Sequence, residues 1–152
     1  MTYLDISEFA DAVMEIMPAL MKEYMRRHVG NFYKMKITMP QFFVLEFLSR
    51  RDESKMSDIA EFMDVSTAAV TGIVDRLVRD GYIVRTSDPR DRRVVMVKLT
   101  AKGISTVKDI MEARKQATIK IFSGISQRER EEYLKILTHI KEHVEGQEES
   151  AK

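Results

Sequence analysis

Residues 57–100 decide the fold and read SDIAEFMDVSTAAVTGIVDRLVRDGYIVRTSDPRDRRVVMVKLT. Two segments with a helical spacing of apolar residues are separated by a turn at Asp64-Val65, and Gly81 ends the second segment, as a glycine just past a helix commonly does. Two β-rich runs follow, on either side of the polar tip Asp88-Pro89-Arg90-Asp91-Arg92-Arg93, which indicates a hairpin with a long loop. This order predicts a winged helix-turn-helix in a mainly α chain with a small β wing, an α+β fold.

The second helix of this stretch has the surface that the major groove of DNA requires. A recognition helix brings its N-terminal turns to the base edges in a groove about 12 Å wide, and bulky side chains would hold it away. Ser66 can cap this helix, and small residues fill its first turns. The positions expected to face DNA are Ser66, Thr67, Ala68, Ala69, Thr71, Asp75 and Arg76. The positions expected to face the core are Val70, Ile73, Val74 and Leu77.

The tip of the hairpin provides a second set of predicted DNA contacts. Arginines in such a loop can enter an adjacent minor groove, where the negative potential is enhanced. The residues concerned are Arg90, Asp91, Arg92 and Arg93. We expect Asp91 to hold the guanidinium of Arg93 through a bidentate pair.

Each of these features also fits a simpler explanation when it is taken alone. Helix, helix and hairpin form a general packing unit, and winged helices also serve as protein-interaction modules without specific DNA binding. The distribution of charge favours DNA: residues 66–103 carry eight Lys and Arg against four Asp and Glu, a net charge of +4 in a chain whose total is +1. Residues 38–65 and 126–152 have net charges of −3 and −2. The combination of motif and charge therefore predicts a binder of double-stranded DNA.

Long amphipathic helices are expected on both sides of this stretch. The first covers residues 4 to about 28, and Gly30-Asn31 then breaks it, so that residues 29–37 form a connection. Thr38 caps a short, largely buried helix. After the hairpin, Thr100 and Ser126 cap two further helices. A long apolar face at a chain end must cover either the core of its own domain or a second subunit.

Several classes of function find no support in the residues present. There is no cysteine and no glycine-rich phosphate loop, so we expect neither an enzyme nor a cofactor. No apolar run approaches the length of a membrane span, and the N-terminus lacks the pattern of a secretory signal, which favours the cytoplasm. His139 and His143 lie four residues apart and could form a metal pair. Two solvent-facing histidines are the simpler interpretation, because zinc needs three or four protein ligands.

Residues 40–103 resemble the MarR family of transcription regulators. The shared segments are Pro40-Gln41-Phe42, Ile59-Ala60-Glu61, Val65-Ser66, Val74-Asp75-Arg76-Leu77 and Gly81-Tyr82-Ile83-Val84-Arg85. The most specific likeness is a wing tip with Asp91 and Arg93, followed by Leu99-Thr100-x-x-Gly103. Asp64 departs from the pattern, because such turns usually carry glycine, but aspartate tolerates a positive φ.

The resemblance implies a homodimer in which the first helix and the last two helices of each chain interlock. Two recognition helices would then read a pseudo-palindromic site, and a small aromatic or anionic effector would release a repressor from DNA. The resemblance places this effector near His28, Phe32, Tyr33, Phe42 and Phe43. It divides the chain into residues 1–37 and 101–146 for dimerisation, 38–100 for DNA binding and 147–152 as a flexible tail.

Overall fold

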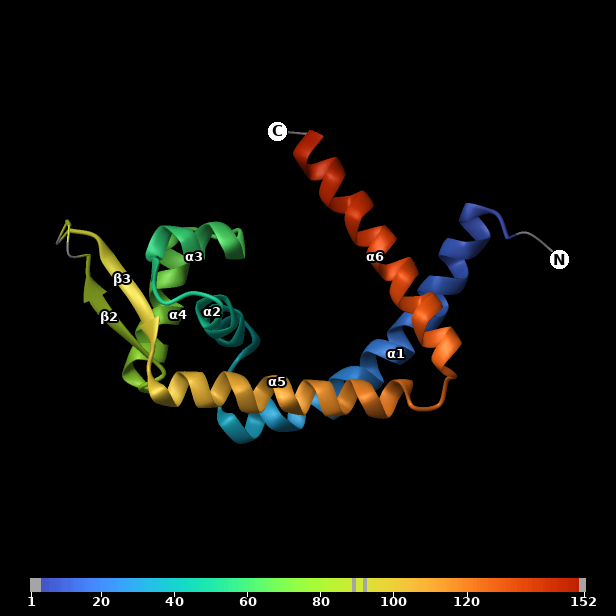
Figure 1. Ribbon diagram of the computed structural model, residues 1–152, viewed down its shortest axis with the longest axis horizontal. Coiled ribbons are helices and arrows are strands. Elements are labelled where there is room, and N and C mark those ends of the chain that lie inside the picture. The colour runs from blue at the N-terminus through green and yellow to red at the C-terminus, as the bar shows by residue number, and fades with distance from the viewer. Residues whose placement is uncertain (1–3, 89, 92, 151–152) are drawn as a thin grey trace. The chain divides into compact units, whose positions relative to one another are not determined.

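The computed structural model describes the backbone of residues 4–88, 90–91 and 93–150, and their side chains apart from 27–35 and 148–150. The structure is mainly helical with a small antiparallel sheet of three strands, as the sequence predicted (Figure 1). The chain forms two compact units, Met1–Lys115 and Gln116–Lys152.

The first unit contains the winged helix-turn-helix. Its elements in chain order are α2 (Met39–Ser49), β1 (Ser54–Lys55), α3 (Met56–Met63), α4 (Thr67–Arg79), β2 (Ile83–Ser87) and β3 (Val95–Leu99). β3 is the central strand and pairs with β2 from Ile83↔Leu99 to Ser87↔Val95. β1 pairs with the other edge of β3, with Ser54 opposite Val97. The sequence contains no indication of β1, because a strand of two residues has no periodicity to detect.

The turn between α3 and α4 forms as predicted. Asp64 adopts the left-handed conformation, with φ 51° and ψ 47°, and so takes the place of the usual glycine. The backbone N–H of Val65 donates to the carbonyl oxygen of Ala60 at 3.1 Å. The hydroxyl oxygen of Ser66 accepts from the backbone N–H of Ala69 at 3.2 Å, which caps α4. At the other end of the helix Gly81 has φ 78°, a conformation that side chains disfavour.

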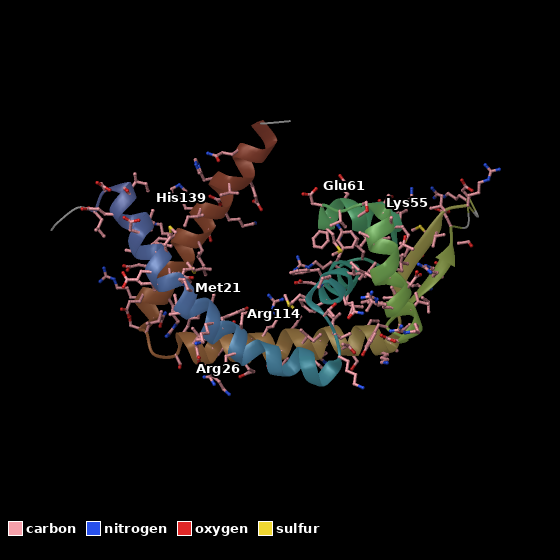
Figure 2. All side chains as sticks on the ribbon, turned by 180° about the vertical axis from the view of Figure 1, so that it is seen from behind. Met21, Arg26, Lys55, Glu61, Arg114 and His139 are labelled. Atoms are coloured by element: carbon pink, nitrogen blue, oxygen red, sulfur yellow. The ribbon has the colours of Figure 1, made fainter. Side chains whose placement is uncertain are left out.

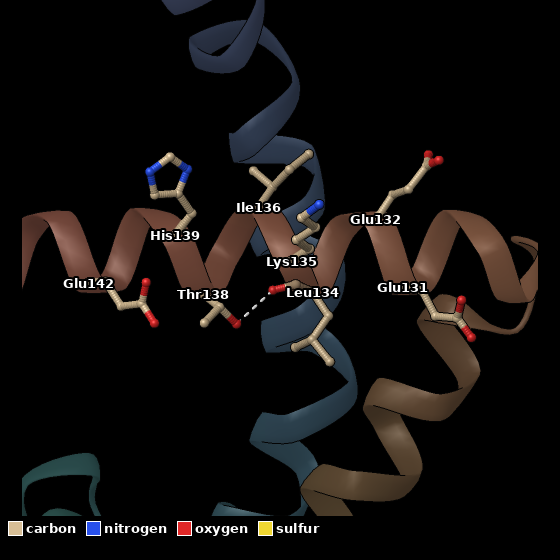
Figure 3. A pocket seen from close by; sticks show the side chains of 8 residues that line it. All are labelled: Glu131, Glu132, Leu134, Lys135, Ile136, Thr138, His139 and Glu142. Carbon is tan, nitrogen blue, oxygen red and sulfur yellow. Dashed lines mark hydrogen bonds between the residues drawn. The ribbon is translucent and has the colours of Figure 1, made fainter.

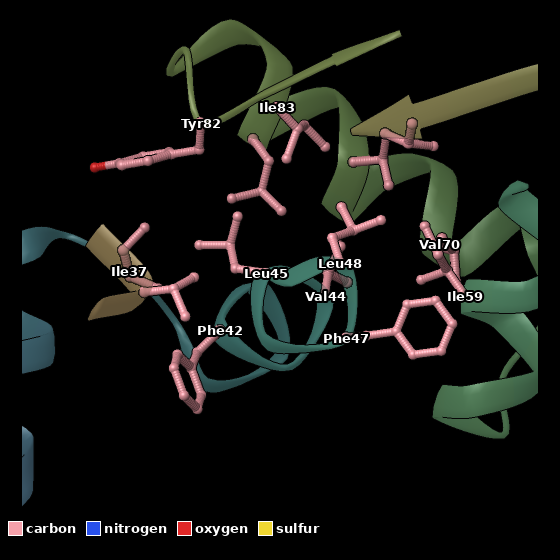
Figure 4. Packing of buried hydrophobic residues seen from close by; sticks show 14 of the residues in the cluster. Ile37, Phe42, Val44, Leu45, Phe47, Leu48, Ile59, Val70, Tyr82 and Ile83 are labelled. Carbon is pink, nitrogen blue, oxygen red and sulfur yellow. The ribbon is translucent and has the colours of Figure 1, made fainter. Parts of the chain in front are cut away.

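A single hydrophobic core fixes the orientation of α4 (Figure 4). Val70, Val74 and Leu77 are fully buried, as their spacing predicted. They lie among the buried side chains of α2, α3, β2, β3 and α5, including Phe42, Leu45, Leu48, Ile59, Ile83, Val97 and Ile110. Because each fully buried side chain of this size contributes about 1.5–3 kcal/mol, rotation of α4 about its axis would be costly.

The first and last helices are longer than the sequence predicted. α1 (Ile6–Met35) continues through the expected break at Gly30-Asn31, so the predicted connection is helical as far as Met35. α6 (Gln127–Ser150) continues through Gly146 into the expected tail. A glycine inside a helix costs only about 1 kcal/mol relative to alanine, which a long helix tolerates. α5 (Ala101–Phe122) begins where Thr100 was expected to cap it.

The start of α5 is fixed against the junction between α4 and β2. The hydroxyl of Thr100 donates to the carbonyl oxygen of Gly81 at 2.7 Å and accepts from the backbone N–H of Gly103 at 3.1 Å. A Cβ atom at Gly103 would lie 2.1 Å from the carbonyl oxygen of Tyr82, so only glycine fits. The ammonium of Lys102 donates to the carbonyl oxygen of Asp80 at 2.7 Å. The Leu-Thr-x-x-Gly segment thus holds α5 at the base of the wing.

The second unit contains the end of α5 and all of α6. α6 begins with the predicted cap at Ser126, which forms a capping box with Glu129. The Glu129 carboxylate accepts from the backbone N–H of Ser126 at 2.7 Å, and the Ser126 hydroxyl accepts from the backbone N–H of Glu129 at 3.3 Å. The hydrogen bonds from Ser126 lower the pKa of the Glu129 carboxyl below its ordinary value. The rings of Phe122 and Tyr133 pack with their centroids 5.3 Å apart.

Candidate DNA-binding interface

α4 presents its small residues to solvent. All seven positions that the sequence assigned to DNA contact on this helix or its cap are exposed, and Gly72 is exposed beside them. The opposite side of the helix is anchored by Val70, Val74 and Leu77, which are fully buried. The helix has 13 residues and is therefore about 20 Å long, which is enough for its first turns to enter a major groove.

The hydroxyl groups at the start of α4 are already engaged within the helix. Thr71 donates its hydroxyl proton to the carbonyl oxygen of Thr67 at 2.8 Å. The outward side of Thr71 is therefore suited to accept a hydrogen bond from a base or to place its methyl group against a thymine methyl. The oxygen of Ser66 accepts the capping bond from Ala69 and keeps its own proton to donate.

Asp75 forms an ion pair that the sequence did not predict. Its Oδ1 atom lies 2.6 Å from Nη2 of Arg85, a residue of β2 that was not among the predicted DNA contacts. The strand pattern contained a signal for it: side chains alternate along a strand, so Arg85 lies on the same face as the buried Ile83 and therefore points toward α4. Arg85 thus joins the candidate interface, and Asp75 is its ionic partner.

The wing tip is ordered by two aspartates acting on the backbone. Oδ1 of Asp88 accepts from the backbone N–H of Arg90 at 2.7 Å, and Oδ1 of Asp91 accepts from the backbone N–H of Arg93 at 3.0 Å. Among the described residues no ion pair joins the Asp91 carboxylate to the Arg93 guanidinium, so the predicted bidentate pair is absent. Arg90 and Arg93 are exposed, and Arg92 lies outside the described residues.

Comparison with known proteins identifies the family. The MarR family model matches residues 37–95, from the segment between α1 and α2 to the start of β3. The HTH-type transcriptional repressor MdtR of Bacillus subtilis (strain 168) is 32% identical over 111 residues, which are 73% of this chain and 72% of that protein. The chain belongs to the MarR family. MarR-family proteins are transcription regulators, and MdtR is named a repressor.

A second related protein and a solved structure support the MarR assignment. The uncharacterized HTH-type transcriptional regulator YfiV of the same organism is 37% identical over 84 residues, covering 55% of this chain and 52% of YfiV. The crystal structure of YusO from Bacillus subtilis superposes with a TM-score of 0.79 at 27% identity, covering 91% of this chain and 99% of that one. The similarity of fold therefore extends well beyond the segment that the MarR family model matches.

The residues predicted to line an effector pocket in this MarR-family chain are only partly described. The side chains of His28, Phe32 and Tyr33 lie outside the described residues. Phe42 is fully buried in the core of the winged unit, whereas the neighbouring Phe43 is 40% exposed on α2. Phe43 is thus the one predicted pocket residue with a described side chain that a ligand can reach from solvent.

An aromatic pair lies at the other end of α2 and was not anticipated. The rings of Phe47 and Phe62 are 4.6 Å apart between centroids, and the guanidinium carbon of Arg51 lies 3.9 Å from the Phe47 centroid. Two hollows of about 450 and 500 Å³ lie beside these three residues. Glu61 of α3, labelled in Figure 2, lines the smaller one. Both hollows lie in the winged unit, between α2 and α3.

α6 does not present a metal site within the part of the chain that is described. His139 lines an open hollow whose eight lining residues all belong to α6 (Figure 3). His143 is not among them, and its Nε2 atom lies 3.0 Å from Nε2 of Gln147. No group of three or more His, Asp or Glu side chains able to hold a metal ion occurs among the described residues.

Across the described helices of this MarR-family chain, none is both long and apolar enough to cross a membrane.

Proposed function

We propose that the chain is a homodimeric transcriptional repressor that binds a pseudo-palindromic operator in double-stranded DNA. The observation that carries this proposal is the exposed face of small residues on α4, held outward by a fully buried opposite side. The wing adds exposed arginines whose backbone is fixed by Asp88 and Asp91. A helix that fits the major groove beside a cationic hairpin that reaches an adjacent groove is an arrangement suited to sequence-specific binding.

The proposed dimer rests on apolar side chains that a single chain leaves in solvent. Phe9 and Leu20 of α1 are 53% and 51% exposed, and Leu134 and Ile140 of α6 are 65% and 53% exposed. Soluble monomers rarely expose large contiguous apolar patches, and each of these helices carries several exposed apolar side chains. A twofold operator requires that a second copy covering these faces place the two α4 helices about one turn of DNA, roughly 34 Å, apart.

A small aromatic or anionic effector completes the proposal. The exposed ring of Phe43 offers one apolar contact for such a molecule. Its centroid lies 6.2 Å from that of Phe42, and the guanidinium carbon of Arg114 lies 5.2 Å from the Phe42 centroid. Because the proposed target is chromosomal DNA, we place the protein in the cytoplasm. Binding of the effector would lower operator affinity by changing the spacing between the two α4 helices.

The salt dependence of DNA binding tests the proposed function. The full chain is titrated onto a labelled duplex from the region upstream of its own coding sequence, with a scrambled duplex as control, and fluorescence anisotropy is recorded at rising salt. We expect tighter binding to the upstream duplex and a steep linear fall of log affinity with log salt, with a slope of about −0.9 for each phosphate contact. Failure to bind either duplex at low salt would contradict the proposal.

The variant Arg93→Ala locates the proposed contact on the wing. The side chain is exposed, so its removal should weaken binding to both duplexes, lower the salt slope and leave the melting temperature within about 2 °C of that of the wild type. The Asp91 bond acts on the backbone of residue 93 and persists in the variant. A loss of stability equal to the loss of affinity would assign Arg93 to the fold.

A further inference from the structure

The ion pair between Asp75 and Arg85 joins the recognition helix to the wing. Nη2 of Arg85 lies 2.6 Å from Oδ1 of Asp75, and the two side chains are 36% and 55% exposed. Pairs as exposed as this one contribute little to folding stability. Folding stability therefore does not explain the pair. Because the pair lies on the exposed surface of α4 that is proposed to face DNA, we considered a role in DNA binding.

The register of the sheet explains why these two residues meet. Arg85 pairs with Val97 of β3, and residues opposite each other in a sheet share a face. That face is the core side, because Val97 is fully buried and Ile83, two residues before Arg85, is 1% exposed. Arg85 lies on this face of the sheet, and its guanidinium reaches Asp75 of α4.

We propose that Arg85 is a further DNA contact, which binds a backbone phosphate, and that Asp75 is a positioning residue that aims its guanidinium. This inference rests on the proposed DNA-binding function. A guanidinium has five N–H donors, so the carboxylate of Asp75 leaves others for a phosphate. A bare carboxylate on the surface of α4 would repel DNA, whereas one paired with Arg85 is neutralised and holds the arginine in one orientation.

The variant Asp75→Asn distinguishes positioning from repulsion by the sign of its effect. If Asp75 acts only as a negative charge near DNA, its neutralisation tightens binding. If it positions Arg85, the same substitution weakens binding by about threefold to tenfold. Asp80→Asn is the matched control. Asp80 also forms an ion pair with an arginine, Arg79, at 3.0 Å, but it lies at the C-terminal end of α4. This control should leave affinity unchanged or raise it.

The variant Arg85→Gln tests the phosphate contact through the salt slope. We expect the slope of log affinity against log salt to fall by about 0.9 per chain that contacts DNA. Lys98→Gln removes one positive charge from the same sheet, but Lys98 pairs with Val84 and therefore lies on the opposite face. Its slope should stay at the wild-type value. The probe for all variants is a duplex selected by the wild-type protein from a random-sequence library.

The double variant Asp75→Asn/Arg85→Gln measures whether Asp75 acts through Arg85. A positioning residue that acts through Arg85 adds nothing once Arg85 is absent, so the double variant should bind as Arg85→Gln does. Additive losses, tighter binding by Asp75→Asn or an unchanged slope for Arg85→Gln would each overturn the inference. Thermal unfolding of each variant checks the fold. If the wild type selects no duplex, the proposed function fails; if it selects one and the variants behave as controls, this inference alone fails.

Discussion

The side chain of Thr71 lies on the exposed face of α4, and its hydroxyl proton is held by the carbonyl oxygen of Thr67. Thr71 can therefore offer DNA its methyl group and the lone pairs of its hydroxyl oxygen. Replacement by tyrosine would place a large ring where α4 approaches the bases. We expect Thr71→Tyr to weaken specific binding at least about tenfold and to change binding to scrambled DNA little, because phosphates rather than bases hold the non-specific complex. Parallel titrations of the two duplexes measure this, and equal losses on both would contradict it.

The start of α5 has no room for a side chain at Gly103. A Cβ atom there would lie 2.1 Å from the carbonyl oxygen of Tyr82 and 3.1 Å from Cδ2 of Leu99, so the start of α5 would have to shift. We expect Gly103→Ala to lower the free energy of unfolding by about 1–3 kcal/mol. Gly146→Ala is the matched control: its Cβ meets nothing within 4 Å, and alanine in a helix should raise stability by up to about 1 kcal/mol. Urea unfolding of both variants decides the point, and equal stabilities would refute the explanation.

At the scale of elements, the capping box of α6 predicts a pH dependence. The hydrogen bonds from Ser126 lower the pKa of the Glu129 carboxyl. A depressed folded-state pKa means that the ionised cap stabilises the helix above the unfolded pKa of about 4.3, and that this contribution is lost as the pH falls through the lower, folded value. We expect Glu129→Gln to remove this part of the acid response. Helical circular dichroism of the two proteins from neutral to acidic pH measures it, and identical acid profiles would contradict the assignment.

The elements also show how far the sequence determines the structure. α3, the turn at Asp64, α4 and the hairpin were predictable, because apolar spacing, caps and turn residues all agreed there. The ends of α1 and α6 were not, because a single glycine lowers helix propensity without deciding the outcome in a long helix. β1 could not be predicted, because a strand of two residues is too short to show a periodic pattern.

The candidate site was predictable in its exposed positions and not in its side-chain partners. The spacing of apolar residues along α4 was enough to separate the exposed face from the buried one. The alternation along β2 indicates the face on which Arg85 lies, but not that Arg85 pairs with Asp75, and residue spacing does not encode the backbone partner of Asp91. Helical periodicity assigns a residue to a face, whereas a contact between elements requires the tertiary structure.

At the scale of the whole molecule, the exposed apolar side chains of α1 predict that this helix forms part of a dimer interface. Phe9 and Leu20 are eleven residues apart, about three helical turns, and therefore lie on one face. We expect Phe9→Glu/Leu20→Glu to convert a dimer into a monomer and to reduce operator affinity, because each half-site would then be bound alone. Sedimentation velocity at micromolar concentration measures the state. Val95→Glu, which alters an exposed apolar residue of the wing, should remain dimeric; a monomeric wild type would contradict the account.

We propose that two copies of α4 and the wing read DNA together, and hydroxyl-radical footprinting of the full chain on its selected duplex measures this. We expect two protected patches related by a twofold axis, with centres about 10 base pairs, or one helical turn, apart, and protection that extends outward where the wings reach the flanking grooves. A single protected patch, or uniform protection along the duplex, would contradict it.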